Sequence, residues 1–94
     1  MKAAEFATIT QSVIRKQGFS EFLPTVCFPE RRDIRTLAGA PQSDPQESIA
    51  TNWASKLAKP GEEYLVAFKH SAREFKIIRY VGTEQEHHVY AAEA

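Results

Sequence analysis

The chain has little of several features on which whole classes of function depend. It holds a single cysteine among its 94 residues, so no disulfide can form within it. Nowhere do enough apolar residues run together to form a membrane-spanning helix, and "MKAAEFATIT" lacks the continuous apolar stretch of a secretory signal. We therefore expect a soluble protein of a reducing compartment, with the cytoplasm as its default location and no membrane partner.

A net charge is missing as well. Lysine plus arginine and aspartate plus glutamate each number 12, so the formal net charge is +0. Because non-specific nucleic-acid binding depends on neutralising phosphates, a balanced chain is a poor candidate for it. Such a chain also lacks the self-repulsion that keeps copies apart, which favours association.

Recognisable catalytic and cofactor motifs are absent too. The sequence contains no Walker loop, no dinucleotide-binding glycine pattern, no zinc-finger spacing and no serine nucleophile elbow. We therefore expect no cofactor and favour a non-catalytic protein. An enzyme stays an open alternative, because catalytic sites are also built from scattered residues.

What the chain does have is material for one core. It is 43% hydrophobic and 11% aromatic, and its length suits one domain over residues 1–94. Residues 3–17 place their apolar side chains on one helical stripe, and Gly18 offers the left-handed residue with which many helices end. This pattern predicts a first helix over residues 3–17.

A second helix is predicted from Asp44 as N-cap, Pro45 at the first helical position and Glu47 at the third. An apolar residue then recurs every four positions, which gives the helix one buried stripe. Trp53 lies on this stripe and is expected to anchor it in the core. Pro60 and the glycine after it end the helix.

Five segments alternate apolar and polar side chains as strands do; they are residues 21–28, 34–37, 62–70, 73–81 and 86–92. The element order is then α-β-β-α-β-β-β. It predicts a single α+β domain with a five-stranded, mainly antiparallel sheet and both helices on one face. Because Pro24 has no amide hydrogen, the first strand either lies at a sheet edge or begins after it.

The alternation divides the strands into two faces. One is apolar and suits the helices; it holds Val26, Phe28, Tyr64, Val66, Phe68, Phe75 and Ile77. A solvated second face should be polar, yet Leu65, Ala67, Ile78 and Tyr80 belong to it. These four residues predict a face covered by a partner subunit or a ligand. The alternatives are a helix on that face or a register shifted by one residue.

Cys27 is a candidate nucleophile. Arg31 and Arg32 would favour its thiolate if the turn that contains them folds back towards the thiol. One of the three histidines of the chain would serve as base. No glycine-rich turn or helix start follows to supply an oxyanion hole. A lone cysteine in a strand is more often a small apolar core residue, so both interpretations stay open.

The stretch "EQEHH" offers three residue types that bind metals, Glu86, His87 and His88. Adjacent residues of a regular strand point to opposite faces, so the two histidines cannot hold one ion. The remaining pair of ligands is too few for a dedicated site. We expect no metal.

Two groups of cations are candidate binding sites. In "PERRDIR", Arg31, Arg32 and Arg35 predict a site for an anion or an acidic partner; the alternative is a solvated turn with weak ion pairs. In the second group, basic and aromatic side chains alternate as on single-stranded RNA-binding sheets. That group comprises Lys69, Arg73, Lys76, Arg79 and Tyr80. Its alternative is a solvated cationic hairpin.

The favoured function is that of a small non-catalytic interaction protein, which forms a homodimer or binds another protein. The contact would use the apolar second sheet face or the strand that contains Pro24. The alternatives are a nucleic-acid-binding module that uses the hairpin of residues 69–80, and a small-ligand binder or enzyme that uses Cys27.

Overall fold

A computed structural model describes residues 1–38 and 46–93. Its helices are α1 (Ala3–Gln17) and α2 (Glu47–Leu57), with two short 3-10 turns, η1 (Phe19–Glu21) and η2 (Pro29–Arg31). Its strands are β1 (Thr25–Phe28), β2 (Asp33–Thr36), β3 (Tyr64–Ser71), β4 (Glu74–Val81) and β5 (Glu84–Ala91). All neighbours pair antiparallel in the order β2-β1-β3-β4-β5. The predicted fold class and element order are confirmed.

Helix α1 occupies the predicted residues. It ends at Gly18, whose φ of 86° lies in the left-handed region and whose N–H donates to the Ile14 carbonyl at 2.8 Å. A side chain with a Cβ is strained at this φ, which explains the glycine. Phe19 then turns back onto the cluster that contains Ile14.

Helix α2 is shorter than predicted. It begins at Glu47, and the predicted cap Asp44 and first-turn Pro45 lie outside the described residues. It ends at Leu57 because Ala58 is already extended, with φ −76° and ψ 141°.

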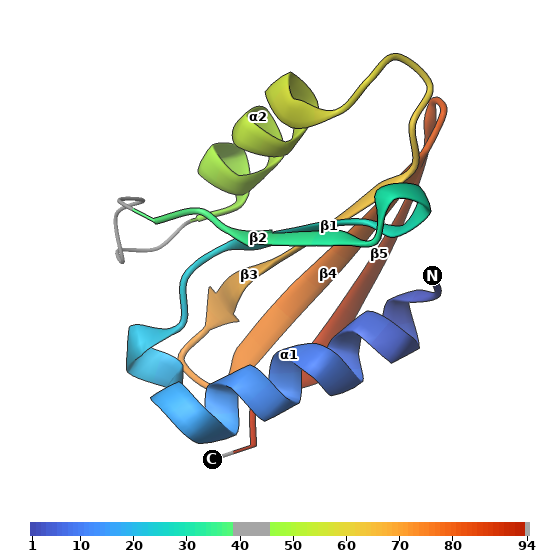
Figure 1. Cartoon of the computed structure of the whole chain (residues 1–94). Coiled ribbons are helices and arrows are strands. Elements are labelled where there is room, and N and C mark those ends of the chain that lie inside the picture. Colours follow the sequence, from blue (N-terminus) through green and yellow to red (C-terminus); the bar gives the residue numbers. More distant parts are fainter. Residues whose placement is uncertain (39–45, 94) are drawn as a thin grey trace.

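The two helices lie on opposite faces of the sheet, so the prediction of both on one face is wrong (Figure 1). The α1-side core contains Ala3, Phe6, Ala7, Ile14, Phe22, Cys27, Leu65, Ala67, Phe75 and Ile77. The α2-side core contains Val26, Phe28, Leu37, Ala50, Ala54, Val66, Phe68 and Ile78. Both faces of the sheet therefore bury apolar surface against a helix. The apolar second face is covered by a helix of the same chain, which was the alternative to a partner subunit or a ligand.

The predicted division into faces is also wrong for β4. Ala67 is opposite Ile77 and Lys69 is opposite Phe75, and the register shifts between Lys69 and Ser71. His70 is the extra residue of this bulge. A one-residue shift exchanges every side chain beyond it, so Phe75 and Ile77 join the α1 face.

Strand β1 is an interior strand rather than an edge strand, since it pairs with both β2 and β3. Of the two roles expected for Pro24, only the delayed start is correct, because β1 begins after it. The Pro24 carbonyl still accepts a hydrogen bond from the Leu37 N–H at 2.8 Å.

Trp53 is not a core anchor, because 51% of it is exposed. The residues of α2 that face the sheet are Ala50 and Ala54, both fully buried. Their small side chains allow the helix to approach β3 closely, which leaves the bulkier Trp53 on the flank. Its ring lies 5.9 Å from the Lys56 ammonium.

Adjacent residues of β4 test the two-sided core. Ile77→Val and Ile78→Val each remove one buried methylene, from opposite faces. We expect each to lower the free energy of unfolding by about 1 kcal/mol, the usual cost in a packed core. Urea denaturation measures this, and Val89→Ala on exposed β5 should change it by less than about 0.5 kcal/mol. Destabilisation by only one isoleucine variant would show that only one face is packed.

Candidate functional site

Cys27 lies on the α1 face of β1 and is 1% exposed. Among the described residues, its recorded hydrogen-bond partner is the Met1 Sδ, 3.8 Å from Sγ, and no histidine contacts it. Burial raises the pKa of the Cys27 thiol. A pocket of about 290 Å³ adjoins it, lined also by Pro29, Arg32 and Ile34. Burial therefore favours the protonated thiol and shields it from solvent, and among the described residues no histidine adjoins it to act as a base.

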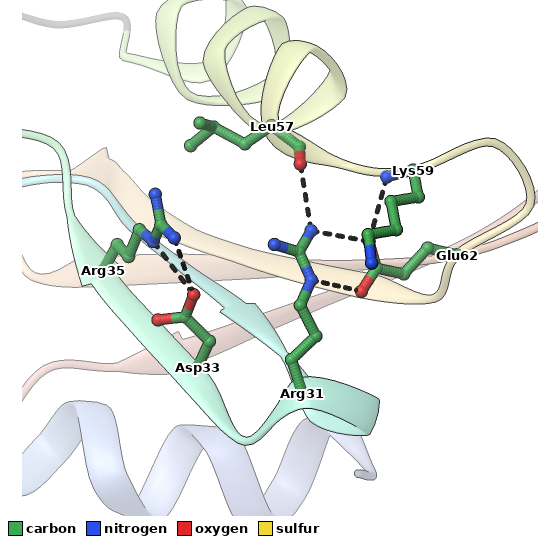
Figure 2. A network of polar contacts seen from close by, with 6 residues as sticks. All are labelled: Arg31, Asp33, Arg35, Leu57, Lys59 and Glu62. Carbon is green, nitrogen blue, oxygen red and sulfur yellow. Dashed lines mark hydrogen bonds and ion pairs between the residues drawn. The ribbon is translucent and has the colours of Figure 1, made fainter.

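Arg31 is the centre of a network of polar contacts (Figure 2). Its Nε donates to Glu62 Oε2 at 2.7 Å, and its Nη2 donates to Glu62 Oε1 at 2.6 Å and to the Leu57 carbonyl at 2.9 Å. The guanidinium also lies 4.1 Å from the centroid of the Phe28 ring. The Lys59 N–H donates to Glu62 Oε1 at 2.9 Å. The network ties η2 to the segment between α2 and β3.

The three arginines predicted as an anion site do not form one group. Arg31 already binds Glu62, and Arg35 binds Asp33 with an Nη2–Oδ2 distance of 2.9 Å (Figure 2). The Arg32 side chain is exposed, and its backbone has a left-handed φ of 53°. Among the described residues, Arg32 forms no ion pair. Two of the three positive charges are thus neutralised within the chain.

The four apolar residues predicted as an open interface do not share a face. Leu65 and Ala67 are fully buried in the α1-side core, whereas Ile78 is buried in the α2-side core. Tyr80 is half-buried and stacks on Tyr64, with ring centroids 4.6 Å apart. The bulge in β3 separates them, and the helices cover both faces.

The predicted nucleic-acid residues are also divided. Lys69 and Arg79 lie on the α1 face, where Lys69 Nζ donates to the Ser20 carbonyl at 2.8 Å and Arg79 binds Glu63 at 2.6 Å. Lys76 and Tyr80 lie on the α2 face, and Lys76 Nζ is 3.4 Å from a Glu47 carboxylate oxygen. Arg73 is exposed in the turn between β3 and β4. Nucleic-acid binding stays a prediction, without a single basic surface.

The histidines of β5 lie on opposite faces, since His87 is opposite Ile78 and His88 is opposite Ile77. Within residues 1–38 and 46–93, no three His, Cys, Asp or Glu side chains gather in a group that could hold a metal ion.

The outer edge of β5 is unpaired within the part of the chain that the structure describes. The Ala92 N–H donates to the Arg73 carbonyl at 2.8 Å, so it points towards β4. Backbone groups of an antiparallel strand alternate between its two sides. Gln85, His87 and Val89 therefore direct their N–H and C=O groups outward, away from β4.

A side chain of α1 closes one end of this edge. Gln11 Nε2 donates to the Ala91 carbonyl, and Gln11 Oε1 accepts a hydrogen bond from the Glu93 N–H at 3.0 Å. The Gln11 amide thus takes the place that a backbone amide of a sixth strand would have. An ion pair between Arg15 and Glu93 at 2.6 Å holds the same end. Because the Ala91 carbonyl is occupied, Gln85, His87 and Val89 are the described residues of β5 whose outward N–H and C=O groups are both available.

The two edges of the sheet differ in how they are protected. Strand β2 is four residues long, whereas β5 has eight residues, with only Tyr90 half-buried. Charged side chains (lysine above all), proline, a bulge or a short length usually protect an edge strand from pairing. Strand β5 carries Glu84 and Glu86 but neither proline nor lysine, and its pairing with β4 is regular from end to end. We take the open edge of β5 as the candidate functional site.

The sequence analysis offered the strand that contains Pro24 as a possible edge for pairing, and it missed β5 because the sequence does not reveal the strand order. The site is made of backbone groups, and their availability depends on the strand order. The partial signal in the sequence was a long final strand without proline or lysine.

No protein-family model matches this chain, and neither a curated protein nor a solved structure is significantly similar to it. Among the described residues, neither helix has the length and apolar content that crossing a membrane requires.

The buried thiol leads to a prediction about labelling. We expect iodoacetamide to label Cys27 in the folded protein much more slowly than a free thiol at pH 7, because burial disfavours the thiolate and blocks access. Mass spectrometry measures the rate. The control is Ile34→Cys with Cys27→Ala, since Ile34 is opposite Cys27 but 46% exposed. Faster labelling of Cys27 than of this control would contradict the assignment.

The Arg31–Glu62 pair leads to a prediction about pH. Hydrogen bonding to Arg31 lowers the pKa of Glu62 from its ordinary value of 4.5 to about 2. The stabilisation is complete above pH 4.5 and is lost as the pH falls towards about 2. Glu62→Gln should therefore be less stable than the parent at pH 6 and nearly equal to it at pH 2. Urea titrations across this range measure the difference; a constant difference would contradict the pairing.

Proposed function

We propose that this domain is a protein-interaction module that binds an extended strand along the open edge of β5. The observation that carries the proposal is the row of outward N–H and C=O groups on Gln85, His87 and Val89. These groups form a template to which another strand can add, as in other proteins that recognise peptides by strand addition.

Backbone pairing alone leaves such binding weak. Each of the three residues offers one donor and one acceptor, and a net hydrogen bond contributes about 1 kcal/mol. The loss of translational and rotational freedom costs about 4 kcal/mol or more. Because these two contributions are of similar size, the side chains that flank the edge must decide which strand is accepted.

Side chains on both faces of β5 are available for this selection. Val89 is 46% exposed on the α2 face beside Gln85 and His87. Glu86 and His88 are exposed on the α1 face. The combination suits a strand that carries an apolar residue on one face and complementary charges on the other.

Amide hydrogen exchange, followed by NMR, tests the proposal with a peptide of the β5 sequence, "EQEHHVYA". Bound peptide, or an edge occupied by any strand, should slow exchange at Gln85, His87 and Val89. The amides of Glu86 and His88 face β4 and are already protected, so they are internal controls.

A peptide that is N-methylated at both histidines is the matched control, because each methyl group removes a central donor from one edge of the peptide and obstructs the approach of another strand on that edge. We expect it to leave exchange at the three outward amides unchanged. Unprotected exchange at these amides at saturating unmodified peptide and at high protein concentration would refute the proposed function.

A further inference from the structure

We infer that the strand received by β5 is β5 of a second copy of this chain, paired antiparallel about a two-fold axis at His87. This inference rests on the proposed function and names its partner. The axis would be perpendicular to the sheet, so that two five-stranded sheets would join into one sheet of ten strands.

The three residues whose outward N–H and C=O groups are both available, Gln85, His87 and Val89, are symmetric about His87. In a two-fold pairing, each hydrogen-bonded position must meet a position whose groups also point outward. Gln85 of one copy then meets Val89 of the other, and the two His87 residues meet each other. Every outward N–H and C=O group from Gln85 to Val89 finds a partner in this register.

Neighbouring registers fit less well. An axis at His88 pairs Gln85 with Ala91, whose carbonyl already accepts a hydrogen bond from Gln11. An axis at Glu86 pairs Gln85 with His87 and places Val89 opposite Thr83, beyond the start of β5. The Gln11 contact therefore selects the register in addition to closing the end of the edge.

The side chains of the α1 face are complementary in the same register. Glu86 of each copy is opposite His88 of the other, and both residues are exposed. Within one chain, Glu86 lies 3.3 Å from Arg79 and 4.0 Å from His88, so it already contacts positive or ionisable groups. An axis at Glu86 would instead place the two Glu86 carboxylates opposite each other, which is unfavourable.

A second copy also has room. Helix α1 packs on β3 and β4, and α2 packs on β1 and β3, so neither is centred over β5 (Figure 1). At about 4.8 Å between strands, the two α1 helices would lie roughly 19 Å apart. That distance exceeds a helix diameter of about 10–12 Å. The formal net charge of +0 removes long-range repulsion between copies.

Single cysteines in a Cys27→Ala background test the register. His87→Cys places two thiols opposite each other, at a Cα separation of about 5.5 Å that a disulfide can span. We expect most of this variant to form a disulfide-linked dimer under mild oxidation, as seen on a non-reducing gel. The Glu86→Cys chain alone and the His88→Cys chain alone should each form at least fivefold less disulfide-linked dimer. In each case the two copies of the introduced cysteine lie too far apart for a disulfide.

A mixture of the Glu86→Cys and His88→Cys chains should form the mixed disulfide, because these positions face each other across the axis. A maximum for either single variant rather than for His87→Cys would overturn the inferred register. Circular dichroism of each variant confirms that it is folded before oxidation.

Light scattering of the unmodified chain supplies the second measurement. We expect a mass near twice 10.6 kDa at high protein concentration. Val89→Pro should be monomeric, because it removes an outward N–H, whereas Ile34→Ala, at an exposed position on β2 at the opposite edge of the sheet, should remain dimeric. A monomer at all concentrations, together with no disulfide-linked dimer of the His87→Cys variant, overturns this inference. If the β5 peptide still protects the three outward amides in that case, the proposed function stands.

Discussion

Strand β3 is buried on both of its faces, and the rest of the structure depends on this constraint. Leu65 and Ala67 face α1 while Val66 and Phe68 face α2, and all four are almost fully buried. A strand of this kind needs neighbours on both edges and a layer on both faces. Small residues on each helix, such as Ala7 and Ala54, allow the two layers to approach the sheet closely. The helices therefore cannot share a face without exposing half of this core.

The sequence was sufficient for the elements and insufficient for their faces. Apolar periodicity and Gly18 predict α1 with its observed bounds, because helix signals are local. The side on which β4 presents Phe75 depends on one extra residue, His70, in the hairpin that precedes it. Nothing in "FKHSAREF" distinguishes a regular hairpin from a bulged one by side-chain type. That single residue changed a predicted interface, Leu65 with Ile78, into two separate buried cores.

Most of the charged side chains that the sequence predicted as binding residues form ion pairs or hydrogen bonds with other residues of the same chain. Arg31 recognises a carboxylate, as its chemistry suggested, but the carboxylate belongs to Glu62 of the same chain. An arginine and a glutamate so far apart in the sequence give no signal of pairing until the β1–β2 turn and the segment after α2 are brought together. The same limit applies to Gln11, whose amide completes the edge of a strand at the opposite end of the chain.

The two edges of the sheet show how these long-range contacts decide what remains available. Next to β2, the Arg31 network fixes the preceding turn, and the strand itself is only four residues long. At β5, Gln11 binds the Ala91 carbonyl and the Glu93 N–H, so that among the described residues a central segment is left with its backbone unpaired on the outer side. By closing one end of an eight-residue strand, it leaves Gln85–Val89, a segment centred on His87, and this centre is the reason for the register that we infer for pairing with a second copy.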